Sequence, residues 1–132
     1  MTKYRNSHVP PGFEGELENI AVDFDGVVHN FDKGWHDGTC YGDPLPGSLE
    51  AIKKLSKKYN VIIFSAKVRP DRPLVEGKSG KELVIEWLKK HEIFSCVKDV
   101  THEKPRAQYY IDDKAIKFVD NWEEILKEVC NI

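Results

Sequence analysis

Two short apolar runs, each stopped by polar residues, constrain the fold of this chain more than any other feature. Residues 20–24 (Ile-Ala-Val-Asp-Phe) are followed by Asp25, and residues 61–64 (Val-Ile-Ile-Phe) are followed by Ser65. Runs of this length, rich in β-branched residues and apolar almost throughout, are typical of strands buried on both faces of a parallel sheet. Three weaker candidate strands follow at residues 96–100, 109–111 and 116–119.

Segments with helical periodicity separate these runs. After Pro46-Gly47, Leu49, Ile52 and Leu55 recur at three- and four-residue spacing, with Ser48 as the expected N-cap. Ser79 and Glu82 have the spacing of a capping box, which predicts a second helix with Leu83, Val84, Trp87 and Leu88 on its apolar face. A last helix is expected from Asn121, with Trp122 among its core residues. Alternating strands and helices predict an α/β fold with a doubly wound, Rossmann-like parallel sheet.

Length and composition limit the domain organisation and the partners. A chain of 132 residues has room for one core, so we expect an irregular lead-in over 1–18 and a single domain over 19–132. The net charge of −2 gives no general attraction to nucleic acid or anionic lipid, and no apolar run approaches a membrane span. Three cysteines without a CxxC pair favour reduced thiols and a cytoplasmic location.

The residues that end the predicted strands carry the chemistry. Asp23 and Asp25 close the first run, Ser65 the second, and Asp112-Asp113 the run at 109–111, with Lys104 in the loop before it. Parallel strands bring their carboxyl ends to one edge of the sheet, so these groups are expected to lie together. A single aspartate at a strand end usually makes a turn or caps a helix. The complete set in this order indicates a functional site.

These motifs resemble those of the haloacid dehalogenase-like phosphohydrolases. The family's first motif matches Asp23-Phe24-Asp25-Gly26-Val27, its second matches Val61 to Ser65, its third is a lysine that matches Lys104, and its fourth matches Tyr109 to Asp113. Members usually carry an inserted cap domain. Here the intervals between motifs hold only a loop and single helices or strands, so a domain without a cap insertion is expected.

The resemblance implies a role for each matched residue, and the charges involved are consistent with these roles. Asp23 is the expected nucleophile and Asp25 the general acid and base. The resemblance implies that Asp23, Asp25 (through its backbone carbonyl), Asp112 and Asp113 form or support an Mg²⁺ site, since hard cations prefer oxygen ligands. Phosphoryl oxygens are expected at Ser65 and at the neighbouring Ala66 and Lys67, with Lys104 neutralising charge.

The function that follows is Mg²⁺-dependent phosphatase activity on a phosphomonoester, through an aspartyl-phosphate. The alternatives are a binding protein that has lost catalysis and a receiver-like phospho-acceptor domain. A receiver places its acidic pair after the first strand, whereas here the pair comes last. A small phosphorylated substrate is the expected partner and no membrane is expected. A capless site is open, which leaves room for a larger substrate, nucleic acid included, or for a second subunit as cover.

Two further clusters of polar or charged residues follow these motifs in the sequence. His29, His36, Asp37 and Cys40 lie in the loop over 26–46, but their spacing fits no standard zinc site. The basic residues after Ser65 (Lys67, Arg69, Arg72 and Lys78) fit a solvated loop and a second anion-binding site equally well. The loop over 26–46 is expected to hang over Asp25, with Trp35 as a candidate for selecting the substrate.

Overall fold

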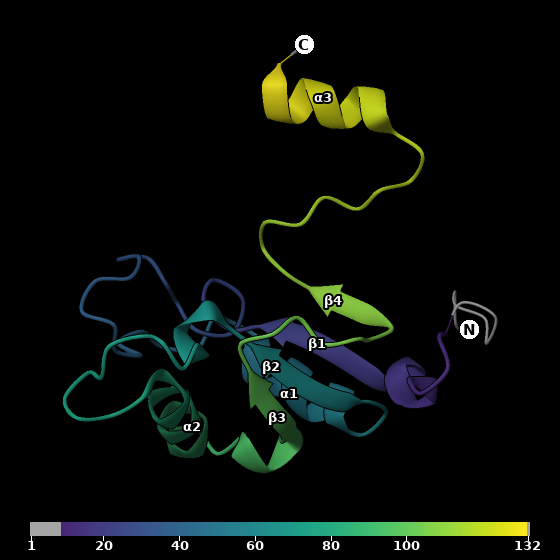
Figure 1. Ribbon diagram of the computed structural model, residues 1–132. Helices are drawn as coiled ribbons and strands as arrows, with labels where there is room; N and C mark the ends of the chain where they lie inside the picture. The colour runs from purple at the N-terminus through teal and green to yellow at the C-terminus, as the bar shows by residue number, and fades with distance from the viewer. Residues whose placement is uncertain (1–8, 132) are drawn as a thin grey trace.

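A four-stranded, all-parallel sheet in the order β3-β2-β1-β4 organises the protein (Figure 1). The computed structural model describes residues 9–131. The strands are β1 (Asn19–Asp23), β2 (Asn60–Phe64), β3 (Val97–Thr101) and β4 (Tyr109–Ile111). The helices are α1 (Ser48–Ser56), α2 (Gly80–Lys90) and α3 (Trp122–Cys130), and 3-10 turns occupy η2 (Glu14–Glu18), η3 (Ala66–Val68) and η4 (Phe94–Cys96). The predicted α/β class and parallel sheet are confirmed.

One face of the sheet forms the core. Strand register places Ile20 opposite Val61 and Val22 opposite Ile63, and all four side chains are buried. Ile52 of α1 joins the same buried cluster, as do residues of α2 that include Trp87. Both crossover helices therefore cover this face, as expected when successive right-handed crossovers move along the sheet in one direction.

The last helix does not provide a second layer. Within the described chain no residue of α3 is buried, and Trp122, expected in the core, is 65% exposed. Figure 1 shows α3 standing away from the sheet at the end of an extended segment. Helices on both faces, as in a doubly wound sheet, are therefore not seen among the described residues. The strand predicted over 116–119 is wrong, because those residues take no regular structure.

The predicted N-cap is correct for α2 and wrong for α1. Ser79 and Glu82 form the predicted capping box, with both reciprocal hydrogen bonds present. The N-cap of α1 is instead Gly47, in the left-handed region at φ 82°, while the Ser48 hydroxyl donates to the Val28 carbonyl at 3.4 Å. Gly80 lets α2 begin against η3, because a Cβ there would lie 1.7 Å from the Lys67 carbonyl oxygen.

The segment over 26–46 is tied to the core rather than left as an open loop. Val28 and His29 are buried, the Leu45 N–H donates to the Val28 carbonyl, and the Trp87 indole donates to the Gly42 carbonyl at 2.9 Å.

The predicted lead-in over 1–18 contains a regular element, η2, while its first eight residues lie outside the described range. None of the described helices combines the length and apolarity needed to cross a bilayer.

Candidate active site

Three carboxylates meet at the carboxyl edge of the sheet. Asp23, Asp112 and Asp113 each offer an oxygen, and these oxygens all lie within 4.8 Å of one another. The sheet register produces this meeting: β1 and β4 are neighbours and Val22 pairs with Ile111, so the next residues, Asp23 and Asp112, leave the sheet side by side. The predicted gathering of these three aspartates is present in the structure.

Gly26 allows Asp113 to approach the first motif closely. Gly26 has a φ of 85°, and a Cβ at this position would lie 2.6 Å from Asp113 Oδ2. Any side chain there would meet both the steric cost of the left-handed region and a clash with the carboxylate. The glycine after Asp25 therefore brings the end of β4 against the backbone that follows β1.

Burial and crowding raise the pKa of Asp23 to about 6. Desolvation is the largest cause, and the nearby charges of Asp112, Asp113 and Asp25 act in the same direction. A hydrogen bond from the Phe24 N–H to Asp23 Oδ1, at 2.8 Å, opposes the rise by stabilising the carboxylate. A divalent cation would relieve this repulsion, and an all-oxygen donor set fits Mg²⁺ or another hard ion.

This raised pKa makes Asp23 contribute less to the stability of the metal-free protein at neutral than at acidic pH. Asp23 binds its proton more tightly in the folded protein, so its contribution to stability is full below about pH 3.8 and is lost as the pH rises through about 6. After allowance for solvent screening we expect a loss of about 1–2 kcal/mol. Asp23→Asn removes this titration.

Urea denaturation in EDTA at pH 4 and pH 7.5 measures the effect. The stability of Asp23→Asn relative to wild type is expected to rise between the two pH values. A difference that stays constant would show that Asp23 titrates as it does in the unfolded chain.

Asp25 is held by two buried groups. Asp25 Oδ1 lies 2.9 Å from His29 Nδ1 and 3.7 Å from Lys67 Nζ. His29 is 0% exposed and Lys67 1% exposed, while the Asp25 side chain keeps 16% exposure. The Lys67 ammonium also donates to the Thr39 carbonyl at 3.1 Å. A carboxylate that reaches solvent is thus anchored through one of its oxygens.

Ser65 lies at the carboxyl end of β2, the neighbour of β1, and its hydroxyl is already an acceptor. The Ser65 Oγ accepts a hydrogen bond from the backbone N–H of Lys67 at 3.1 Å, and the backbone N–H of Ser65 donates to the Thr101 carbonyl. Neither of these N–H groups is therefore available for a phosphoryl oxygen. The hydroxyl proton of Ser65 and the N–H of exposed Ala66, the first residue of η3, are the donors that suit this task.

The two lysines of the predicted site are placed differently from expectation. Lys104 is exposed, and its ammonium lies 4.4 Å over the ring of Tyr110. Lys67, expected to help hold phosphoryl oxygens beside Ser65, is instead buried beside Asp25, and its ammonium lies within 5.5 Å of the ring centroids of Phe31 and Trp35. Lys67, rather than Lys104, is the lysine that directly contacts an aspartate of the first motif.

The remaining members of the basic run mostly form surface pairs. Arg69 binds Asp71 at 2.8 Å and Lys78 binds Glu86 at 2.9 Å, all four side chains being exposed. Arg72 lies 5.3 Å over Trp35, which is 43% exposed. Because these two exposed cations are already paired with carboxylates, the structure favours the solvated-loop interpretation for Arg69 and Lys78.

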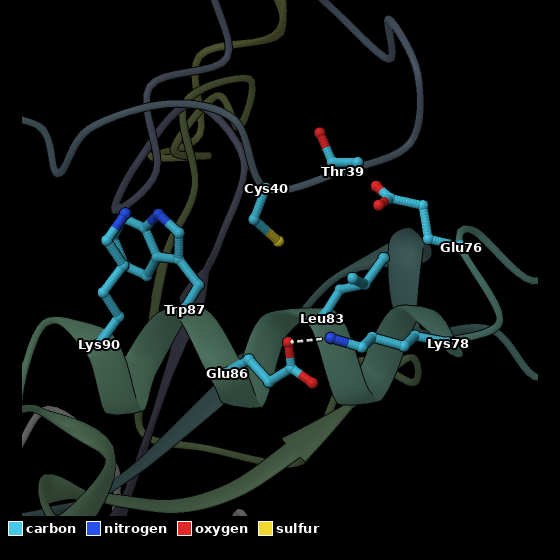
Figure 2. Close-up of a pocket in the computed structure, with 8 residues that line it drawn as sticks. All are labelled: Thr39, Cys40, Glu76, Lys78, Leu83, Glu86, Trp87 and Lys90. Atoms are coloured by element: carbon cyan, nitrogen blue, oxygen red, sulfur yellow. Dashed lines mark hydrogen bonds and ion pairs between the residues drawn. The ribbon is translucent and has the colours of Figure 1, made fainter.

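A cleft of about 570 Å³ lies between α2 and the segment over 26–46 (Figure 2). Its lining combines the thiol of Cys40, the indole of Trp87 and four charged side chains, of which Lys78 and Glu86 bind each other. Burial raises the pKa of the Cys40 thiol to about 12, so this thiol is not a nucleophile at neutral pH. Thr39 connects the cleft to the candidate active site, since its carbonyl accepts a hydrogen bond from the Lys67 ammonium.

The contacts of His29 are not predicted by any motif in the sequence. Both of its ring nitrogens have protein partners, Asp25 Oδ1 and the Gly42 N–H, so it has no nitrogen left for a zinc ion. Among the described residues the group suited to a metal is the aspartate cluster, not the histidines of this segment. The apolar pair before it, Val27-Val28, was a signal that the chain returns to the core at this point.

Comparison of the chain with models of protein families, with curated proteins and with solved structures yields no match.

Proposed function

We propose that this protein is an Mg²⁺-dependent phosphatase that hydrolyses phosphomonoesters through an aspartyl-phosphate, on a haloacid dehalogenase-like, parallel α/β fold. The observation that carries the proposal is the meeting of Asp23, Asp112 and Asp113 within 4.8 Å, beside an Asp25 anchored by His29 and Lys67. Three carboxylates crowded together are costly in an empty site, and a fourth held apart from them suits proton transfer.

Asp23 acts as the nucleophile in the first step. The Phe24 N–H occupies Oδ1, so Oδ2 attacks phosphorus. With a pKa of about 6 the carboxylate is mostly ionised at pH 7. Mg²⁺, when held by the aspartate cluster, supplies positive charge that offsets the repulsion between carboxylate and phosphate. The ester P–O bond breaks, and the leaving oxygen takes a proton from Asp25.

Water completes the cycle in the second step. Asp25, now a carboxylate, takes a proton from water as the water oxygen attacks phosphorus. The bond between phosphorus and Asp23 breaks, inorganic phosphate leaves, and Asp25 is again protonated for the next substrate. The Ser65 hydroxyl and the Ala66 N–H are suited to hold the phosphoryl oxygens during both steps.

A panel of alkyl and aryl phosphomonoesters, assayed with Mg²⁺ and with EDTA, tests this function. Multiple turnovers that require Mg²⁺ would support it. Phosphorylation by acetyl phosphate that stops after one phosphoryl group per chain would instead indicate a phospho-acceptor domain, because storage rather than turnover is the mark of that class. Hydrolysis of neither ester class would contradict the proposal.

Asp25→Asn tests the general acid directly. The substitution is expected to lower kcat for an alkyl phosphate by about 10²–10⁴-fold, and for an aryl phosphate much less in the first step, since an aryl leaving group needs no proton. Burst kinetics with the aryl ester isolates that step. Equal losses in the first step for alkyl and aryl esters would remove Asp25 from this role.

A further inference from the structure

We propose that His29 is a positioning residue which, as a neutral imidazole, donates a hydrogen bond from Nδ1 to Asp25 Oδ1 and so directs the other oxygen, Oδ2, toward the substrate. This inference rests on the proposed phosphatase function and adds a residue to it that the sequence motifs do not contain.

The partners of His29 fix its tautomer. The Gly42 N–H lies 2.8 Å from Nε2 and is a donor, so Nε2 is the acceptor and carries no proton. The proton of the neutral ring is then on Nδ1, which lies 2.9 Å from Asp25 Oδ1. The other tautomer, which would leave Asp25 without a hydrogen bond from His29, is excluded because its Nε2 proton would point at the Gly42 N–H.

Packing fixes the plane of the ring as firmly as the hydrogen bonds fix its nitrogens. The imidazole lies parallel to the Phe24 ring at a centroid distance of 5.0 Å, with Tyr41 and Trp87 edge-on at 5.2 and 5.6 Å. A fully buried imidazole among aromatic rings is costly unless both nitrogens are bonded. An aliphatic residue would fill the space without that cost, which points to a use for the Nδ1 proton.

Both buried contacts of Asp25 fall on the same oxygen. His29 Nδ1 and Lys67 Nζ each approach Oδ1, which leaves Oδ2 as the oxygen that can carry and transfer the proton. Each anchor is also tied to the segment over 26–46: His29 through the Gly42 N–H and Lys67 through the Thr39 carbonyl. The segment over 26–46 therefore positions Asp25 indirectly, by fixing the two side chains that contact Oδ1.

Two substitutions separate the hydrogen bonds of His29. The amide NH₂ of His29→Asn can occupy the Nδ1 position and keep the donor to Asp25, whereas the amide of His29→Gln reaches the Nε2 position and keeps only the contact with Gly42. Both remove the ring, so any general packing loss is common to the two variants. The denaturation midpoints of the two variants measure how much stability both lose with the ring.

The ratio of alkyl to aryl turnover is the functional readout. His29→Gln is expected to lower kcat for an alkyl phosphate by about 10–10²-fold with a much smaller effect on the burst rate of an aryl phosphate, and His29→Asn to restore most of the alkyl activity. In an Asp25→Asn background, His29→Gln is expected to add no further selective loss, because the residue through which it acts is gone. Equal losses for the two ester classes, or for the two variants, would overturn the inference.

A measurement without substrate keeps the test independent of the proposed function. Long-range ¹H–¹⁵N NMR of the wild-type protein is expected to show His29 protonated at Nδ1 alone. A proton on Nε2 would overturn the positioning role, whatever the protein hydrolyses. An Nδ1 proton together with no hydrolysis of any phosphomonoester would uphold the contact and contradict the phosphatase.

Discussion

Asp23→Asn is expected to lower kcat for every phosphomonoester by at least about 10⁴-fold, because an amide of the same shape cannot attack phosphorus. The Phe24 N–H can still donate to the amide oxygen, so the end of β1 keeps its hydrogen bond. The fold is expected to remain intact, and the metal-free variant to be at least as stable as wild type at neutral pH, since a carboxylate with a raised pKa has been neutralised. Steady-state kinetics and circular dichroism of the purified variant measure the two effects.

Asp120→Asn is a matched control for this experiment. Asp120 is exposed and precedes α3, outside the aspartate cluster, so the same chemical change there is expected to leave turnover within about twofold of wild type. If Asp23→Asn kept activity within tenfold of wild type, Asp23 would no longer be the nucleophile. A covalent route through Asp23 would then be excluded.

Removal of divalent cations with EDTA is expected to abolish turnover, and addition of Mg²⁺ to restore it. In the proposed reaction the cation would offset the repulsion among Asp23, Asp112 and Asp113 in the resting protein and between carboxylate and phosphate during turnover. Because Mg²⁺ held by the aspartate cluster would bind the folded protein and not the unfolded chain, it is also expected to raise Tm in proportion to the logarithm of its concentration once the site is saturated.

Asp112→Asn distinguishes a specific site from general screening of charge. This variant is expected to need at least about tenfold more Mg²⁺ for half-maximal activity and to show a smaller rise in Tm, while Asp120→Asn follows wild type. Full activity in thoroughly chelated protein would contradict the metal requirement. An equal Mg²⁺ response of all variants would place the ion elsewhere.

The aspartate cluster was predictable because it depends on local sequence and on one general property of parallel sheets. The runs before Asp23 and Asp112 are apolar enough to be strands, and neighbouring parallel strands end at the same edge. The capping box at Ser79 was predictable for a similar reason, since its two hydrogen bonds join residues only three apart. Such features need no knowledge of distant contacts.

Trp122 and Lys67 differ from the predictions because their environments depend on contacts with residues distant in the sequence. The apolar periodicity of α3 predicts a helix, but it does not determine which surface the helix packs against. Within the described chain α3 has no buried residue, and Trp122 is therefore exposed. Lys67 belongs to a basic run whose sequence fits a solvated loop and an anion-binding site equally well. Its burial follows from the return of the segment over 26–46, whose Thr39 carbonyl and aromatic rings surround the ammonium.

The parallel α/β sheet and the aspartates at its edge follow from local sequence, because strand and helix periodicity and strand-end chemistry are properties of short stretches. The groups that contact Asp25, in contrast, depend on how distant parts of the chain pack together. His29 and Lys67 reach the same oxygen because the segment over 26–46 folds back against α2 through the hydrogen bond from Trp87 to Gly42. A buried polar group is stable only when each of its partners is in place, and those partners come from parts of the chain that no short pattern connects.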